Sequence, residues 1–97
     1  MTKQELINKL VAHKSELRQL GIISLDLFGS AVRNETHEGS DVDLLVEFDQ
    51  AVGLFHFFTV QHRLEEILGV LKVDLVQKGA VHPALRERIF AEAINVA

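Results

Sequence analysis

The sequence contains no cysteine and a single proline, Pro83, among its 97 residues. Without cysteine, neither a disulfide framework nor a thiolate zinc site can form. No apolar run approaches the roughly 20 residues that a helix needs to cross a bilayer. The stretch from Met1 to Leu20 carries too many charges for a signal peptide. These absences predict a cytoplasmic protein without a membrane segment.

The length limits the chain to one compact domain over residues 1–97, with no internal repeat or linker. The apolar fraction of 47% is enough to build a core, so disorder is not expected. A second domain of ordinary size that would hold a substrate does not fit. Whatever the protein acts on must therefore be held by this domain itself, by a homo-oligomer or by a partner chain.

The net charge of -4 argues against broad, sequence-independent binding of nucleic acid. The charge is also uneven along the chain. The stretch over residues 33–49 contains six acids and one base, Arg33. Such a concentration of carboxylates either faces solvent or binds cations.

Hydrophobic periodicity predicts helices and strands in the order α-β-β-α-β-α. A capping box at Thr2 and Glu5 begins the first helix, and Gly21 is placed to end it. This order predicts an α+β (or α/β) domain, in which helices pack on a small mixed sheet and the first two strands form an antiparallel hairpin. The predicted elements are a helix over 3–20, strands over 22–28 and 41–48, a helix over 53–68, a strand over 72–77 and a helix over 83–93.

Asp41 and Asp43 are the most informative pair of acids. At positions i and i+2 of a strand they project from one face, roughly 6–7 Å apart at the backbone. Magnesium favours a few carboxylates completed by substrate phosphate oxygens, and carboxylates can bridge two such ions. The alternative is that both aspartates face water at the start of a strand.

Asp74 lies in the middle of a short apolar strand, flanked by Val73 and Leu75. Either this strand is at the edge of the sheet, with Asp74 in solvent, or Asp74 faces the same site as Asp41 and Asp43. In the second case, three carboxylates on adjacent strands would form a metal site that can activate a hydroxyl.

The Gly29-Ser30 pair follows the first predicted strand directly. Glycine allows a sharp turn and a close approach of a ligand to the main chain, and exposed N–H groups at such a turn bind anions. The guanidinium of Arg33 can contact phosphate through two hydrogen bonds. Each feature also has an ordinary explanation: Gly29-Ser30 can be a common turn, and Arg33 can form a surface ion pair with Glu35 or Glu38.

Three phenylalanines, Phe55, Phe57 and Phe58, crowd the predicted helix over 53–68 and cannot all face inward. The surplus is either a surface for a partner protein or a loosely packed helix end. The five histidines are scattered without the i, i+4 spacing of metal ligands, so we expect no histidine metal site.

Taken together, Leu27-Phe28-Gly29-Ser30, Arg33 and the run from Ser40 to Val46 resemble the signature of the polymerase-beta-type nucleotidyltransferase superfamily. That signature is G-S-x-x-R-G, a spacer, and S-D-x-D-L-x-V. The chain is most similar to the minimal nucleotidyltransferases (MNT), which are often encoded beside a HEPN-domain protein as a toxin–antitoxin pair. The resemblance covers nearly the whole chain, but Asn34 stands where the family has glycine.

The resemblance implies a role for each matched residue. Gly29 and Ser30 would contact the nucleotide triphosphate. Ser40 would touch phosphate at the strand entrance, and Arg33 would lie near the phosphates or brace the loop. The implied catalytic and metal-binding acids are Asp41 and Asp43, which would coordinate magnesium, and Asp74, as a metal ligand or as the base for the attacking hydroxyl.

The first functional hypothesis is Mg²⁺-dependent transfer of a nucleotidyl group, AMP from ATP, to a hydroxyl acceptor on a cognate HEPN toxin, so that the chain acts as an antitoxin. The second is a non-catalytic antitoxin that neutralises its partner by binding. The third is a transferase acting on a small molecule. The acidic charge and short length argue against RNA as the acceptor.

Overall fold

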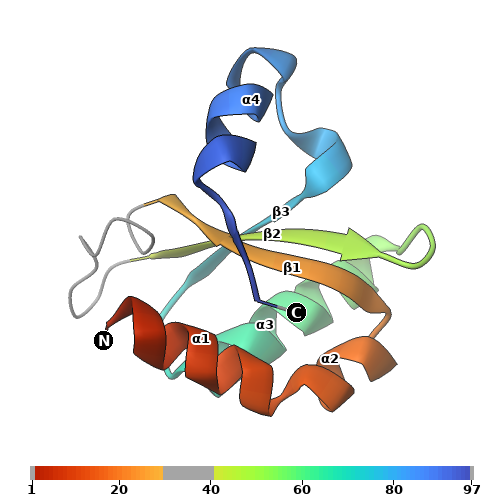
Figure 1. The fold of residues 1–97 in the computed structure, drawn as a ribbon. Helices are drawn as coiled ribbons and strands as arrows, with labels where there is room; N and C mark the ends of the chain where they lie inside the picture. The colour runs from red at the N-terminus through yellow and green to blue at the C-terminus, as the bar shows by residue number, and fades with distance from the viewer. Residues whose placement is uncertain (1, 30–40, 97) are drawn as a thin grey trace.

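A four-stranded mixed β-sheet organises the fold in the computed structural model, which describes residues 2–29 and 41–96. The strands lie in the order β3-β2-β1-β4, and helices lie on both faces of the sheet (Figure 1). The predicted class, a small mixed sheet with packed helices, is confirmed. The elements are α1 (Lys3–Ala12), α2 (Lys14–Gln19), β1 (Ile22–Phe28), β2 (Val42–Phe48), α3 (Leu54–Leu68), β3 (Val73–Gln77), the 3-10 turn η2 (Lys78–Ala80), α4 (Pro83–Glu92) and β4 (Ile94–Asn95).

Two details differ from the sequence prediction. The single helix expected over residues 3–20 is divided at His13, which has φ −106° and ψ 18°. The His13 backbone N–H donates to the Leu10 carbonyl, and its ring Nδ1 lies 2.9 Å from the Lys9 carbonyl oxygen, so the last carbonyls of α1 are satisfied locally. The second difference is β4, which was not predicted because two residues show no periodicity.

The strand register brings distant parts of the sequence together. β1 and β2 are antiparallel, as the predicted hairpin requires, and Phe28 pairs with Asp43. β2 and β3 are parallel, so the chain must cross from one end of the sheet to the other, and α3 makes this crossover. The parallel register places Asp43 directly opposite Asp74.

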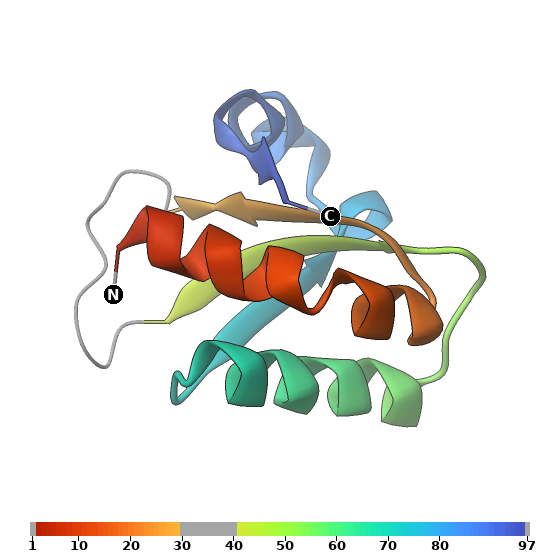
Figure 2. The ribbon, with the colours of Figure 1, turned by 60° about the horizontal axis from the view of Figure 1, so that its bottom comes forward.

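One face of the sheet is covered by α1, α2 and α3 (Figure 2). Each fully buried leucine or valine between these layers contributes about 1.5–3 kcal/mol relative to an exposed one. Over residues 2–29 and 41–96, no helix combines the length and the apolar character that a membrane crossing needs. The fully buried side chains include Leu6, Leu10, Leu17, Leu25, Leu27, Leu44, Leu64 and Leu68.

The opposite face carries α4 alone among the α-helices of the described residues (Figure 2). Pro83 is the first residue of α4 and His82 is its N-cap, which confirms the predicted start of the last helix. No residue of α4 is buried. The buried apolar side chains on this face, Leu45 and Val81, come from β2 and from the segment before α4.

Candidate functional site

The turn after β1 lies against the carboxylate of Asp43. Gly29 has a φ of +73°, a conformation that residues with a Cβ rarely adopt. A Cβ at Gly29 would also collide with Oδ2 of Asp43 and would lie 3.1 Å from its Cγ. Glycine is therefore required here for two independent reasons, its backbone conformation and the closeness of the acid. Its predicted neighbours in the site, Ser30, Arg33 and Ser40, lie outside the described residues.

Asp43 and Asp74 lie side by side on β2 and β3 and line one cavity of about 320 Å³. β3 is an edge strand and Asp74 is exposed, yet it faces the same space as Asp43. Asp74 is therefore an edge-strand residue that shares a cavity with Asp43, but not with Asp41 as the predicted three-acid site requires. The remaining walls of the cavity come from Phe28, Leu45, Val76, Ala80, Val81, His82, Leu85 and Ile89.

Asp41 does not line this cavity. It precedes the first residue of β2, and its half-exposed carboxylate lies 3.8 Å from Nζ of Lys72. A surface ion pair of this kind contributes little to stability, so a cation of higher charge can compete for Asp41 at low cost. The structure thus brings Asp43 and Asp74 together and leaves Asp41 beside Lys72.

The donor atoms at this site are carboxylate oxygens, which suit magnesium. Within residues 2–29 and 41–96, no three His, Asp or Glu side chains are grouped closely enough to form a metal cage. Magnesium in phosphoryl-transfer sites is bound through one or two carboxylates, and substrate phosphates and water supply its other ligands. The Asp43–Asp74 pair fits that mode of binding better than it fits a cage made by protein alone.

His82 is a cavity residue that the sequence analysis did not single out. Its Nδ1 accepts a hydrogen bond from the backbone N–H of Ala84 at 3.1 Å, as an N-cap side chain does. In the neutral ring the proton is therefore on Nε2, and His82 can donate from that atom. The available signal was Pro83, because a proline at the first helical position places the preceding residue at the N-cap.

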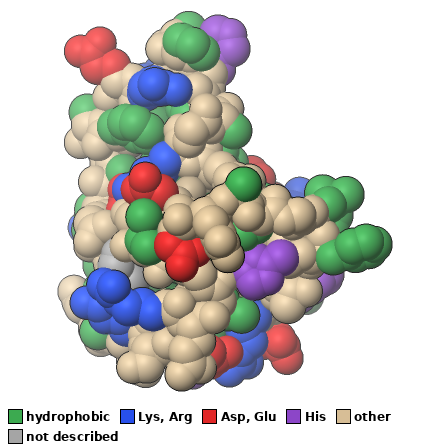
Figure 3. All heavy atoms as spheres, turned by 90° about the vertical axis from the view of Figure 1, so that its right-hand side faces the viewer, with side chains coloured by type: hydrophobic (Ala, Val, Ile, Leu, Met, Phe, Trp, Pro, Cys, Tyr) green, Lys and Arg blue, Asp and Glu red, His purple; other side chains and the backbone are tan. Residues whose placement is uncertain are grey.

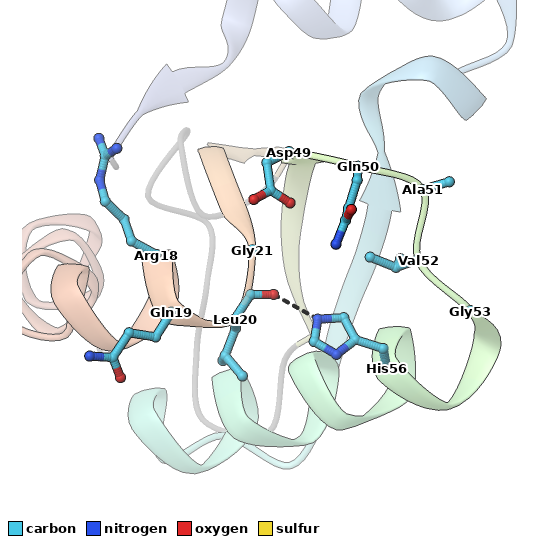
Figure 4. A pocket seen from close by; sticks show the side chains of 10 residues that line it. All are labelled: Arg18, Gln19, Leu20, Gly21, Asp49, Gln50, Ala51, Val52, Gly53 and His56. Atoms are coloured by element: carbon cyan, nitrogen blue, oxygen red, sulfur yellow. Dashed lines mark hydrogen bonds between the residues drawn. The ribbon is translucent and has the colours of Figure 1, made fainter.

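A second cavity, of about 380 Å³, lies where the α2–β1 turn meets the β2–α3 loop (Figure 4). At this cavity, ring nitrogen Nε2 of His56 donates to the Leu20 carbonyl at 2.6 Å. The backbone N–H of Asp49 donates to the Gly21 carbonyl. This cavity is larger than the one lined by Asp43 and Asp74, but it is lined by one carboxylate, that of Asp49, and by none of the predicted site residues. Its chemistry is therefore not that of a two-carboxylate metal site.

The crowded phenylalanines divide between core and surface. Phe57 packs against the core, whereas Phe55 is 89% exposed and Phe58 is 44% exposed. Leu54 beside them is also exposed. Figure 3 views the molecule from the side of the β2–α3 loop and shows hydrophobic side chains projecting from its surface. The beginning of α3 thus presents apolar side chains to solvent.

Comparison with known proteins gives matches over nearly the whole chain. The family described as "Nucleotidyltransferase domain" matches residues 10–96. The protein adenylyltransferase MntA of Thermococcus cleftensis is 39% identical over 97 residues, which cover 99% of this chain and 97% of that protein. A solved structure of a protein assigned as a minimal nucleotidyltransferase has a TM-score of 0.82 at 36% identity, over 97% of this chain and 95% of that one.

More distant solved structures share the fold. One is a chain from the complex of a tri-AMPylated Shewanella oneidensis HEPN toxin with an MNT antitoxin, with a TM-score of 0.68 and 19% identity. The match covers 99% of this chain and 72% of that one. At this identity the likeness establishes the arrangement of helices and strands and no more.

Proposed function

This chain belongs to the nucleotidyltransferase domain family, and we propose that it transfers AMP from ATP to a hydroxyl group on a partner protein. The reaction class predicted from the motifs, nucleotidyl transfer, is confirmed by the family match and by the 39% identical protein adenylyltransferase. The observation that carries the proposal is the register of β2 and β3, which sets Asp43 opposite Asp74 beside the Gly29 turn.

The reaction assigns one task to each part of the site. The acceptor oxygen forms a bond to the α-phosphorus, the bond from that phosphorus to the leaving pyrophosphate oxygen breaks, and the hydroxyl proton passes to Asp74. Asp74 takes this role because it is the more exposed of the two paired acids. Gly29, with Ser30, Arg33 and Ser40, holds the phosphates.

Magnesium is the cofactor that this donor set supports. Asp43 and Asp74 would hold it together with phosphate oxygens of ATP, and Asp41, two residues before Asp43, would be the third ligand. When bound, the metal neutralises charge that develops on the phosphates during transfer. Bound magnesium would offset the repulsion between the neighbouring Asp43 and Asp74 carboxylates, so metal binding and nucleotide binding would favour each other.

The acceptor we propose is a side chain of a cognate HEPN-type toxin, which would make this chain an antitoxin acting in the cytoplasm. The support is the MNT antitoxin fold, which occurs in a complex with an AMPylated HEPN toxin.

The test is transfer of label from ATP to a HEPN-type protein encoded beside this chain. Label should appear on that protein with the unmodified chain and Mg²⁺, and should be lost with Asp43→Asn and with Asp74→Asn. Asp49→Asn is the matched control, because Asp49 is an exposed acid at the other end of β2. Transfer that survives both Asp43→Asn and Asp74→Asn contradicts the proposed site.

A second candidate, neutralisation by binding alone, is favoured by one observation, the exposure of Leu54 and Phe55 at the start of α3. The two candidates differ in their need for chemistry. Full neutralisation of the toxin by Asp43→Asn, together with loss of neutralisation by Phe55→Ser, supports binding alone. Loss of neutralisation by Asp43→Asn, together with full neutralisation by Phe55→Ser, supports catalysis.

A further inference from the structure

Asp26 is a buried carboxylate of β1 that belongs to neither cavity. The residue is 9% exposed, and it is the single buried charged residue in the described part of the chain. Its neighbours Leu25 and Leu27 face the helical core, so alternation along β1 turns Asp26 to the α4 face. Its register partner on β2 is Leu45, a wall of the cavity that holds Asp43 and Asp74.

A buried charge is stable only when it is paired and hydrogen-bonded, and Asp26 meets both conditions. Its Oδ2 lies 3.1 Å from Nζ of Lys78, and its Oδ1 accepts a hydrogen bond of 2.7 Å from Nδ2 of Asn95. Ser24 completes the group, because its Oγ accepts from Lys78 at 2.6 Å and from Asn95 at 3.3 Å. We call Ser24, Asp26, Lys78 and Asn95 the Asp26 cluster.

The two partners of Asp26 stand at opposite ends of the α4 segment, residues 79–94. Lys78 comes directly before this segment and Asn95 directly after it. Asn95 is further fixed by the pairing of β4 with β1 and by the following hydrogen bond from the Val96 N–H to the Leu25 carbonyl, 2.9 Å long. One carboxylate therefore holds both ends of the segment against β1.

Between its two ends the α4 segment has one buried apolar residue, Val81, which precedes the helix. No residue of α4 is buried, so its contacts with the sheet are few. Yet this segment supplies the wall of the cavity that faces the acids, through Val81, His82, Leu85 and Ile89. The position of that wall relative to Asp43 and Asp74 depends on where its ends are held.

We propose that Asp26 is a positioning residue, which sets the α4 segment over Asp43 and Asp74 without touching the reactants. This inference rests on the proposed nucleotidyl transfer, because it concerns the wall of that site. Both oxygens of Asp26 act, one for each end of the segment. Loss of Lys78 or Asn95 removes the side-chain contact at one end, and loss of Asp26 removes its contacts with both ends.

Amide hydrogen exchange tests the structural half of the proposal without any substrate. In folded Asp26→Asn protein, amides of residues 83–92 should exchange about tenfold faster or more, while those of α3 stay protected, because local opening is confined to the released unit. Asn95→Ala is the milder variant, since it keeps the Asp26–Lys78 pair. Lys9→Gln is the matched control, because Nζ of Lys9 donates to the Leu68 carbonyl on the helical face.

Transfer kinetics test the functional half. Asp26→Asn should lower kcat about tenfold, since a misplacement of about 1 Å can cost up to 100-fold, with less than about a twofold change in the KM for ATP. Lys78→Arg keeps the cation and should retain the rate, whereas Lys78→Gln should not. Because Asp26 and Lys78 share one contact, their effects should not add fully: the double variant should be slower than Asp26→Asn by less than the effect of Lys78→Gln alone.

The outcomes separate the two levels of the proposal. Unchanged exchange of α4 in Asp26→Asn overturns the positioning role, and so does faster exchange with an unchanged kcat. An equal rise in exchange across α1, α3 and α4 also overturns it, because it would show general destabilisation. An unmodified chain that transfers no label overturns the proposed function instead, and the exchange result still decides whether Asp26 holds α4.

Discussion

The two faces of the sheet hold their helices by different means. On the face of α1, α2 and α3, apolar side chains that are excluded from solvent form one continuous cluster. On the face of α4, the helix buries none of its residues, and polar contacts at its two ends hold it in place. The paired acids Asp43 and Asp74 lie on this second face. The comparison indicates that stability resides mainly on one side of the sheet and that the candidate site lies on the other.

The largest expected effect is on the α4 face. Asp43→Ala should lower the rate of nucleotidyl transfer by about 10³-fold or more, equivalent to about 4 kcal/mol in the activation barrier, because it removes a carboxylate from the reacting centre. The thermal midpoint should fall by much less than after a substitution in the buried core, since the Asp43 side chain is only partly buried. Labelled-ATP transfer and thermal denaturation of the same preparation measure the two quantities. A variant that loses stability and activity together would contradict this division between the faces.

The mirror experiment acts on the helical face. Leu64 is fully buried in α3, so Leu64→Ala should lower the free energy of unfolding by about 2–5 kcal/mol through lost transfer energy and a residual cavity. Transfer activity per folded molecule should remain close to that of the unmodified chain. Urea denaturation measures the first quantity and initial rates at low temperature measure the second. Leu85→Ala, an exposed leucine of α4, is the control and should cost far less stability.

Gly29 affects both stability and the candidate site, because it directly follows the core strand β1 and lies against Asp43. Gly29→Ala should cost about 1–3 kcal/mol of stability, since alanine is strained at a φ of +73°. It should also reduce transfer, because the new Cβ displaces the Asp43 carboxylate. Gly53→Ala, where a Cβ meets nothing within 4 Å, provides the comparison. Normal activity in a folded Gly29→Ala protein would show that Asp43 need not occupy its present position.

The smallest expected effect concerns the ion pair between Glu16 of α2 and Arg63 of α3. Nη2 of Arg63 donates to Oε1 of Glu16 at 2.9 Å, and Nε donates to the other oxygen. The hydrogen bond from Arg63 lowers the pKa of Glu16 from its ordinary value of 4.5. A lowered carboxyl pKa stabilises the fold above pH 4.5, and this contribution is lost as pH falls through the folded-state pKa.

Arg63→Gln should therefore lower the thermal midpoint slightly at pH 7, where the parent protein has the full contribution. The difference between the two proteins should shrink as the pH falls below 4.5. Thermal denaturation of both proteins over a pH series measures it. Arg88→Gln, an exposed arginine of α4, should show no such pH dependence. A difference in thermal midpoint between the parent and Arg63→Gln that grows as the pH falls below 4.5 would contradict this expectation.

Much of the fold could be predicted because the signals are local. Leucines at helical spacing, the Thr2–Glu5 capping box and the Pro83 start all act within a few residues, and the structure contains each of them. β4 could not be predicted, because its two residues become a strand only through pairing with β1. The break at His13 was missed for a related reason, since a ring contact with the preceding turn leaves no mark on the periodicity.

The site was predictable in part for the same reason. An acid within a short apolar strand drew attention to Asp74, and the register sets it beside Asp43. Asp26 is likewise an acid within an apolar strand, β1. Its partners Lys78 and Asn95 are distant in the sequence and could be identified only in three dimensions. The pairing of Asp41 with Lys72 depends likewise on how β3 meets β2.

The parallel pairing of β2 and β3 has a consequence for the order of folding. The β1–β2 hairpin can form locally and brings Gly29 to Asp43 early. Asp74 joins them only after the α3 crossover has closed, which is a contact of high sequence separation and therefore slow. A chain that has formed only the hairpin has the Gly29 turn beside Asp43 but lacks Asp74. The complete carboxylate pair consequently requires the β2–β3 pairing, and its appearance can serve as a marker for closure of the α3 crossover.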